Sequence, residues 1–191
     1  MDPNRVINLF RESGALLDGH FLYASGRHGR QFLQAARVLQ YPDYTEELCR
    51  GMAELYRDAG IDLVCGPATG GIVLAYETAR HLQCRAVFTE KTDVGSMILR
   101  RGFKLQPGTR VLVVEDIITT GGSVKKTIDH LVERGAIVAG VAVLIDRSKG
   151  EAQFGCRFES LARLDMESWP PDECPLCQAG EPLIDPDDIV L

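Results

Sequence analysis

The stretch that most constrains the fold is residues 110–131, RVLVVEDIITTGGSVKKTIDHL. It opens with an apolar, β-branched run at residues 111–114, which predicts a short strand buried on both faces. It closes with apolar residues spaced as on one face of a helix: Val124, Ile128, Leu131 and Val132. The stretch therefore predicts a strand, a turn and a helix in that order.

The turn within this stretch carries the residue types of an anion site. Two acids, Glu115 and Asp116, end the strand, and the segment Thr119-Thr120-Gly121-Gly122-Ser123 follows. Glycines let backbone N–H groups turn inward, and the unpaired N–H groups of a helix N-terminus favour a phosphate. Carboxylates can accept hydrogen bonds from sugar hydroxyls or face a metal ion. The turn therefore predicts a site for a phosphorylated sugar, with an ordinary βα turn and a solvated acid pair as the alternative.

A second strand, glycine loop and helix precede the first. Residues 61–65 predict a core strand, GPATGGI occupies residues 66–72, and a helix is expected to about residue 82. Two such units favour ligand binding at the carboxyl edge of a parallel sheet. Neither loop matches GxxxxGK[ST] or the GxGxxG of dinucleotide sites.

VLVVEDIITTGGS resembles the PRPP-binding signature of the type I phosphoribosyltransferases. The resemblance implies an α/β fold with a central, mainly parallel β-sheet flanked by helices and a small N-terminal hood. It implies that Glu115 and Asp116 act in catalysis by binding the ribose hydroxyls of PRPP. The implied substrate-binding residues are Thr119, Thr120, Gly121, Gly122 and Ser123 for the 5′-phosphate, and Ala68, Thr69, Gly70 and Gly71 for pyrophosphate.

The N-terminal segment, residues 19–39, points to one family within this superfamily. Its GHFLYASGRHGRQF part resembles the hood hairpin of the orotate phosphoribosyltransferases, in which Ser25 and Phe32 would face the base. Ala24 stands where that family often has a lysine, and Gly70 stands where relatives often have another. Without the family, SGRHGR is a turn with a solvated basic tip.

Two further residues follow from the same resemblance. Arg147 follows a predicted apolar strand, residues 136–145, and is placed to hold the carboxylate of orotate bidentately. Without the family, Arg147 is better explained as a surface residue at a strand end. Lys91 matches a lysine at the base of the family's mobile lid, although residues 90–103 predict only a loop and a small hairpin. Arg100 and Arg101 could supply charge there, or they could be surface charges.

The implied reaction is transfer of the 5-phosphoribosyl group from PRPP to orotate, giving orotidine 5′-monophosphate and pyrophosphate in pyrimidine biosynthesis. Mg²⁺ would bind mainly through PRPP and pyrophosphate, so no protein ligand is assigned to it. A lid shared across subunits implies a homodimer. The alternatives are a phosphoribosyltransferase for a purine or uracil, and a non-catalytic PRPP-sensing regulator of the same fold.

Composition limits the partners and the compartment. The 191-residue chain has a net charge of −6 and 45% hydrophobic residues. This balance argues against nucleic-acid binding, and the lack of a long apolar stretch or signal peptide argues against a membrane. A cytoplasmic protein is therefore expected.

The C-terminal cysteines admit two interpretations. Cys174-Pro175-Leu176-Cys177 is half of a zinc knuckle, but no second CxxC or HxxxH pair follows. A structural turn is favoured over zinc held by Cys174 and Cys177 with Cys156 or a second tail, and over a redox role. The expected organisation is an N-terminal helix to about residue 17 and hood hairpin in 1–40, a PRPP-binding α/β core in 41–165 and a tail in 166–191.

Overall fold

The computed structural model describes residues 1–23 and 25–186; Ala24 and residues 187–191 lie outside the described residues. Its core is a six-stranded sheet with the order β5-β4-β3-β6-β7-β8. The strands β3, β4, β6, β7 and β8 pair in parallel, and β5 pairs antiparallel with β4. Their bounds are β3 (Leu63–Pro67), β4 (Arg85–Lys91), β5 (Met97–Leu99), β6 (Arg110–Ile118), β7 (Ile137–Asp146) and β8 (Phe158–Arg163).

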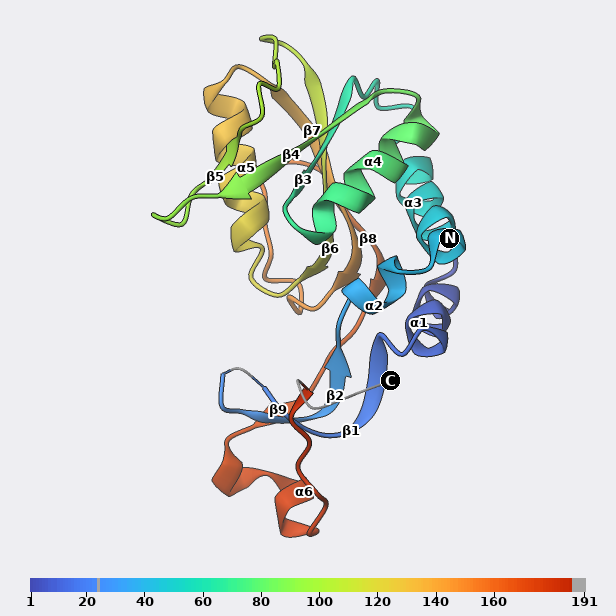
Figure 1. Ribbon diagram of the computed structural model, residues 1–191, viewed down its shortest axis with the longest axis vertical. Helices are drawn as coiled ribbons and strands as arrows, with labels where there is room; N and C mark the ends of the chain where they lie inside the picture. The colour runs from blue at the N-terminus through green and yellow to red at the C-terminus, as the bar shows by residue number, and fades with distance from the viewer. Residues whose placement is uncertain (24, 187–191) are drawn as a thin grey trace.

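Helices cover both faces of this sheet (Figure 1). The helices are α1 (Pro3–Glu12), α2 (Ala36–Leu39), α3 (Pro42–Leu55), α4 (Gly70–Leu82) and α5 (Gly122–Glu133). Alternate residues of β6 enter opposite cores: Leu112 and Val114 pack with α1, α3 and α4, whereas Val111 and Val113 pack with α5. This two-sided burial explains the continuous apolar run, and it confirms the predicted α/β class with a mainly parallel sheet.

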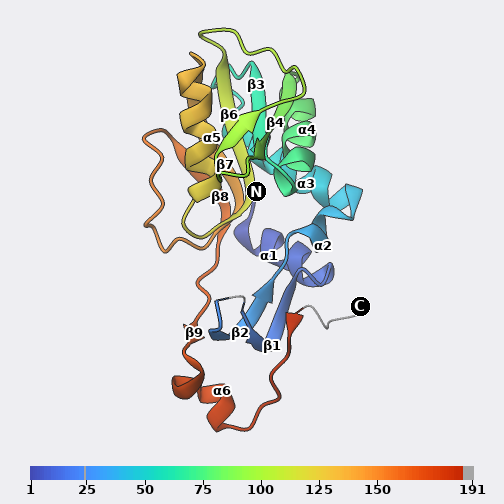
Figure 2. The same cartoon turned by 60° about the vertical axis from the view of Figure 1, so that its left-hand side comes forward.

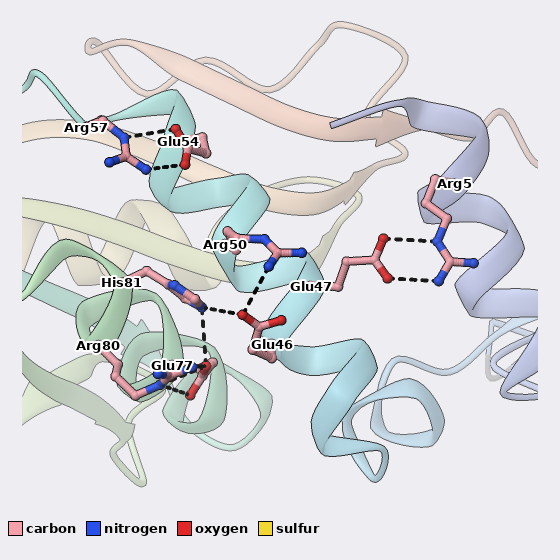
Figure 3. Close-up of polar contacts among 9 residues, drawn as sticks. All are labelled: Arg5, Glu46, Glu47, Arg50, Glu54, Arg57, Glu77, Arg80 and His81. Carbon is pink, nitrogen blue, oxygen red and sulfur yellow. Dashed lines mark hydrogen bonds and ion pairs between the residues drawn. The ribbon is translucent and has the colours of Figure 1, made fainter.

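Ion pairs join the helices on the α3 side of the sheet (Figure 3). Arg5 of α1 donates two hydrogen bonds to the carboxylate of Glu47 on α3, at 3.0 and 2.8 Å. His81 of α4 lies 3.5 Å from Glu46 of α3. Because these groups are partly exposed, packing of the apolar faces contributes more to holding the helices than the charges do.

The hood is a separate three-stranded sheet with the order β1-β2-β9, below the core in Figure 1. It consists of β1 (Leu16–Leu22), β2 (His28–Leu33) and β9 (Ser168–Trp169). The chain then forms the 3₁₀ helix η1 (Pro171–Glu173) and α6 (Pro175–Gln178), and it returns to the hood, where Ile184 bridges Phe21 (Figure 2). The C-terminal segment is therefore built into the hood sheet.

Several predicted boundaries were wrong. The first helix, expected to reach about residue 17, ends at Glu12 because the Ser13 hydroxyl donates to the carbonyl of Leu9, and Gly14 has a positive φ of 67°. Leu16 and Leu17 instead begin β1. The short strand β9, Ser168–Trp169, falls in the segment expected to be only a tail. The small hairpin predicted within residues 90–103 is present: the end of β4 pairs antiparallel with β5.

The packing of Tyr56 against β7 predicts a measurable stability effect. Tyr56 is 1% exposed, and its hydroxyl donates to the carbonyls of Val141 (2.8 Å) and Arg157 (3.0 Å). Tyr56→Phe removes this donor from a buried site, so we expect a loss of about 1–2 kcal/mol in the free energy of unfolding, measured by urea denaturation.

Tyr41→Phe is the matched control, because Tyr41 is 43% exposed. Equal denaturation midpoints for wild type and Tyr56→Phe would contradict a structural role of the Tyr56 hydroxyl.

Candidate active site

The phosphate loop joins the end of β6 to the start of α5. Gly121 lies at the helix N-cap with a φ of +71°, and a Cβ built there would lie 2.7 Å from the ring of Phe154. Both the left-handed backbone and the contact therefore require glycine. The predicted phosphate residues line one cavity of about 290 Å³: Thr119, Thr120, Gly121, Gly122 and Ser123. The first-turn N–H groups of α5 have no partners within the helix, and they suit a phosphate.

The acid pair is half-buried at the carboxyl end of β6. A Glu115 carboxylate oxygen accepts from the backbone N–H of Asp116 (3.2 Å), and Asp116 accepts from the N–H of Ile117 (2.5 Å). Within residues 1–23 and 25–186, neither carboxylate has an ion-pair partner. Burial, followed by the neighbouring Asp116, raises the pKa of Glu115 to about 8, and burial raises the pKa of Asp116.

The second glycine loop lies directly beside Asp116. A Cβ built on Gly70 would lie 2.5 Å from a carboxylate oxygen of Asp116. A Cβ on Gly66 would lie 2.1 Å from the carbonyl oxygen of Gly71, so the loop is closed tightly on itself. The peptide bond between Ala68 and Thr69 is cis. The four predicted pyrophosphate residues 68–71 therefore span the turn after β3 and the first two residues of α4, with Gly70 next to the acid pair. No side chain at position 70 fits without moving Asp116.

Arg147 follows β7 at the same edge of the sheet. Its backbone N–H donates to the carbonyl of Ile118 (2.8 Å), the last residue of β6. This hydrogen bond holds Arg147 next to the start of the phosphate loop. Its Nε is buried and has no hydrogen-bond partner among the described residues. Burial lowers the pKa of Arg147, and the nearby Tyr23 of the hood opposes this shift. A half-buried arginine whose Nε has no partner among the described residues is suited to an anionic ligand.

Lys91 and the β4–β5 hairpin border the phosphate cavity. Lys91, Gly95 and Met97 line it, together with Lys126 of α5. The ammonium group of Lys126 donates to the carbonyl of Gly95 (2.7 Å), so it fastens the hairpin turn to α5. We did not predict Lys126 from the sequence, although its position four residues after Gly122 places it on the same face of the helix.

The predicted hood residues, Ser25 and Phe32, make few contacts with the loops of the core. Phe32 packs against Phe21, with ring centroids 5.7 Å apart, and the guanidinium of Arg37 lies 5.8 Å from the centroid of its ring. Ser25 is exposed at the hairpin turn, and among the described residues no hydrogen bond joins it to the core loops. Tyr23, which the sequence did not single out, is a hood residue near enough to Arg147 for its pKa to be lowered by that charge, although burial raises it more.

Two charges of the region are paired with partners outside the cavity. Arg101, considered a source of lid charge, donates from Nε and Nη2 to the Glu90 carboxylate, at 2.9 and 2.7 Å. Arg27 of the SGR turn donates to the hydroxyl of Ser168 (3.0 Å) and thus connects the hairpin turn to β9. Arg101 therefore stiffens the β4–β5 hairpin, and Arg27 stiffens the hood.

Comparisons with known families identify the class of protein to which this fold and these loops belong. Residues 35–154, more than half of the chain, match the phosphoribosyl transferase domain family. The chain is 48% identical over 186 residues to the orotate phosphoribosyltransferase of Caldicellulosiruptor saccharolyticus, covering 97% of both chains. It is 50% identical to that of Heliobacterium modesticaldum, covering 97% of this chain and 98% of the relative.

Solved structures agree with this assignment. The orotate phosphoribosyltransferase of Aeropyrum pernix has a TM-score of 0.68 and 29% identity, covering 83% of this chain and 93% of that one. An adenine phosphoribosyltransferase of Rhodothermus marinus, 21% identical with a TM-score of 0.65, shares the fold. The chain belongs to the orotate phosphoribosyltransferases, enzymes that transfer the 5-phosphoribosyl group of PRPP to orotate.

The raised pKa of Glu115 predicts how the stability of the ligand-free protein depends on pH. The folded protein holds the proton up to about pH 8, whereas an unfolded glutamate releases it near the ordinary value of 4.5. The folded state therefore binds more protons in this range, and stability should fall as the pH rises from about 5 to about 8. Glu115→Gln should reduce this slope and make the protein more stable than wild type at pH 8, measured by thermal unfolding.

Glu133→Gln, at an exposed position of α5, is the control for loss of one negative charge. Parallel pH profiles for wild type and Glu115→Gln would show that burial does not keep Glu115 protonated.

Proposed function

We propose that the cavity at the carboxyl edge of the sheet is where PRPP and orotate react, with each loop holding one part of the substrates. The phosphate loop at the start of α5 binds the 5′-phosphate, and residues 68–71 hold pyrophosphate. Glu115 and Asp116 face the ribose hydroxyls. What supports this arrangement is the close approach of Gly70 to Asp116, which brings residues 68–71 next to the acids that precede the phosphate loop.

The reaction needs charge to be stabilised at two places. Breaking the bond between C1 of the ribose and the pyrophosphate oxygen leaves positive charge on the sugar and negative charge on pyrophosphate. Asp116, and Glu115 once the bound substrates and cation have released its proton, stabilise the first, because they are held beside the ribose without an ion-pair partner of their own among the described residues. Lys91, at the rim of the cavity, stabilises the second.

A divalent cation fits this site. Two half-buried acids without a cationic partner among the described residues offer hard oxygen ligands to Mg²⁺ or to hydroxyls, and a bound cation would lower the raised pKa of Glu115. Bound Mg²⁺ would neutralise the charge of the leaving pyrophosphate. The chain's own residues hold the ribose, the 5′-phosphate and pyrophosphate in line and exclude water.

Arg147 selects the base by holding the carboxylate of orotate. The observation that carries this role is its buried Nε, which has no partner among the described residues. A planar guanidinium pairs with a carboxylate through two hydrogen bonds, and neutral bases such as uracil or adenine lack that group. Tyr23 and Phe32 of the hood close the space on the other side of the base.

Replacing Arg147 should therefore raise the KM for orotate and leave the KM for PRPP nearly unchanged. We expect Arg147→Ala to raise the KM for orotate at least about tenfold, equivalent to ~1.4 kcal/mol, because a charge-assisted pair is lost. The KM for PRPP should stay within about threefold, since Arg147 does not line the cavity formed by the phosphate loop. Initial rates of orotate absorbance loss with Mg²⁺ and varied PRPP or orotate measure both constants.

Arg100→Ala, at an exposed position, is the control for loss of one arginine. Parallel assays with uracil, hypoxanthine, guanine and adenine test the base. Equal increases in both KM values would remove the carboxylate-binding role from Arg147, and turnover with a neutral base would overturn the assignment of its partner.

We also propose that the working unit is a homodimer, with the β4–β5 hairpin closing the cavity. What supports the dimer is an apolar groove of about 590 Å³ between α3 and α4. Val73 and Tyr76 line this groove and are 44% and 68% exposed. They follow the pyrophosphate loop by less than two helical turns, so a second copy seated there would lie close to the site.

A charge in this groove should separate the subunits. We expect Tyr76→Asp to convert a dimer into a monomer in light scattering after size-exclusion chromatography, because an unpaired carboxylate would be buried in the interface. Val132→Asp, at an exposed position of α5, is the control. A Tyr76→Asp variant that remains dimeric, or a wild-type protein that is monomeric, would place any subunit contact elsewhere.

A further inference from the structure

Four potential metal ligands converge beneath the hood, away from the phosphate cavity. They are His20 of β1, His28 of β2, Cys174 and Cys177, and their ligand atoms all lie within 4.8 Å of one another. His20, His28 and Cys174 are buried, whereas Cys177 is exposed. Both cysteines are free thiols. The group does not include Cys156, which the sequence had suggested as a third ligand.

The spacing of these atoms matches a tetrahedral metal site. Nε2 of His20 lies 3.2 Å from Nδ1 of His28, 3.4 Å from Sγ of Cys174 and 3.7 Å from Sγ of Cys177. Nδ1 of His28 lies 3.2 Å from Sγ of Cys177. Tetrahedral zinc with ordinary bond lengths separates two nitrogens by about 3.3 Å and a nitrogen from a sulfur by about 3.6 Å.

Hydrogen bonding within the group does not account for this convergence. Nδ1 of His20 lies 2.9 Å from the carbonyl oxygen of Glu181, so it carries the proton and donates to that carbonyl. Nε2 of His20 is then an acceptor with one lone pair, yet three potential donors surround it: His28, Cys174 and Cys177. One lone pair cannot satisfy three donors, whereas one cation at the centre accepts lone pairs from all four groups.

The contact with Glu181 is the kind that accompanies a metal-binding histidine. A ligand histidine commonly donates its other ring N–H to a backbone carbonyl, which fixes the tautomer and the ring orientation. The two histidine rings are also tilted by 65° to each other, so they meet at their edges instead of stacking.

The surrounding chain has a structural need for such a site. The segment between Trp169 and Ile184 leaves the β2 edge of the hood sheet and returns to the β1 edge. It holds only a 3₁₀ turn and a four-residue helix, and within it the buried side chains are Cys174 and Leu176. Because this segment buries so few apolar side chains, packing alone holds it weakly against the hood sheet. A metal ion bound by residues of the segment and of the hood can supply the missing stability.

We propose that His20, His28, Cys174 and Cys177 bind one structural zinc ion that fastens the C-terminal segment to both strands of the hood. All four tetrahedral positions are filled by protein, so the ion takes no part in phosphoribosyl transfer. Two thiolates and two imidazoles are the donor set that favours zinc over magnesium.

Metal content of the purified full-length protein tests this. Protein produced with zinc in the medium should retain about one zinc per chain after dialysis, measured by mass spectrometry of the metal. Cys177→Ser removes a ligand at the exposed rim without opening the core. Its zinc content should fall to about a tenth or less, because ligand loss costs more than the ten- to hundredfold seen for outer-shell changes. Cys84→Ser, whose thiol is outside the group, should retain the ion.

Two further readouts do not depend on the variants. Cobalt added to metal-free wild type should give the absorption bands of a tetrahedral thiolate–imidazole centre. Zinc addition should change the fluorescence of Trp169, the single tryptophan, which pairs with His28 across the hood sheet. Wild type with less than about a tenth of a zinc per chain and no tetrahedral cobalt spectrum, or equal zinc in wild type and Cys177→Ser, would overturn the proposal.

Discussion

Burial of β6 on both faces is the constraint from which the active site follows. Leu112 and Val114 are held in one core and Val111 and Val113 in the other, and each is fully buried. A shift of the strand by one residue would exchange these side chains between the two cores, so its register is firmly specified. Glu115 and Asp116 therefore emerge from the sheet at a defined point, and the phosphate loop begins at a defined distance beyond them.

The site is assembled from ionisable groups that have no ion-pair partner within residues 1–23 and 25–186. Two acids lie together at the end of β6, and Arg147, with a buried Nε, follows the neighbouring β7. Each such group destabilises the ligand-free fold, since buried polar groups without partners are costly. In the proposed arrangement, the substrates would supply the complementary groups: hydroxyls with a metal ion for the acids, and a carboxylate for Arg147. Substrate binding would then also stabilise this edge of the sheet.

Much of this could be predicted from the sequence because it is encoded locally. The run from β6 into α5 is continuous in the chain, and so is the GPATGG loop, so strand, turn and helix could be identified from neighbouring residues. What the sequence did not reveal depends on distant contacts. His20 and His28 meet Cys174 and Cys177 only because the chain returns some 150 residues later, although two histidines flanking a predicted hairpin turn were a usable signal. The two-residue β9 is too short to have a period of its own.

The path of the C-terminal segment also covers part of both edges of the hood hairpin. Small sheets expose strand edges whose free N–H and carbonyl groups can recruit another extended chain. Here β9 pairs with β2 on one side, and on the other side Ile184 receives a hydrogen bond from Leu22 and donates one to His20. Both edges of the hairpin are thus partly occupied by the same chain. The part of the molecule that stands apart from the main core is in this way protected against joining the sheet of a neighbouring molecule.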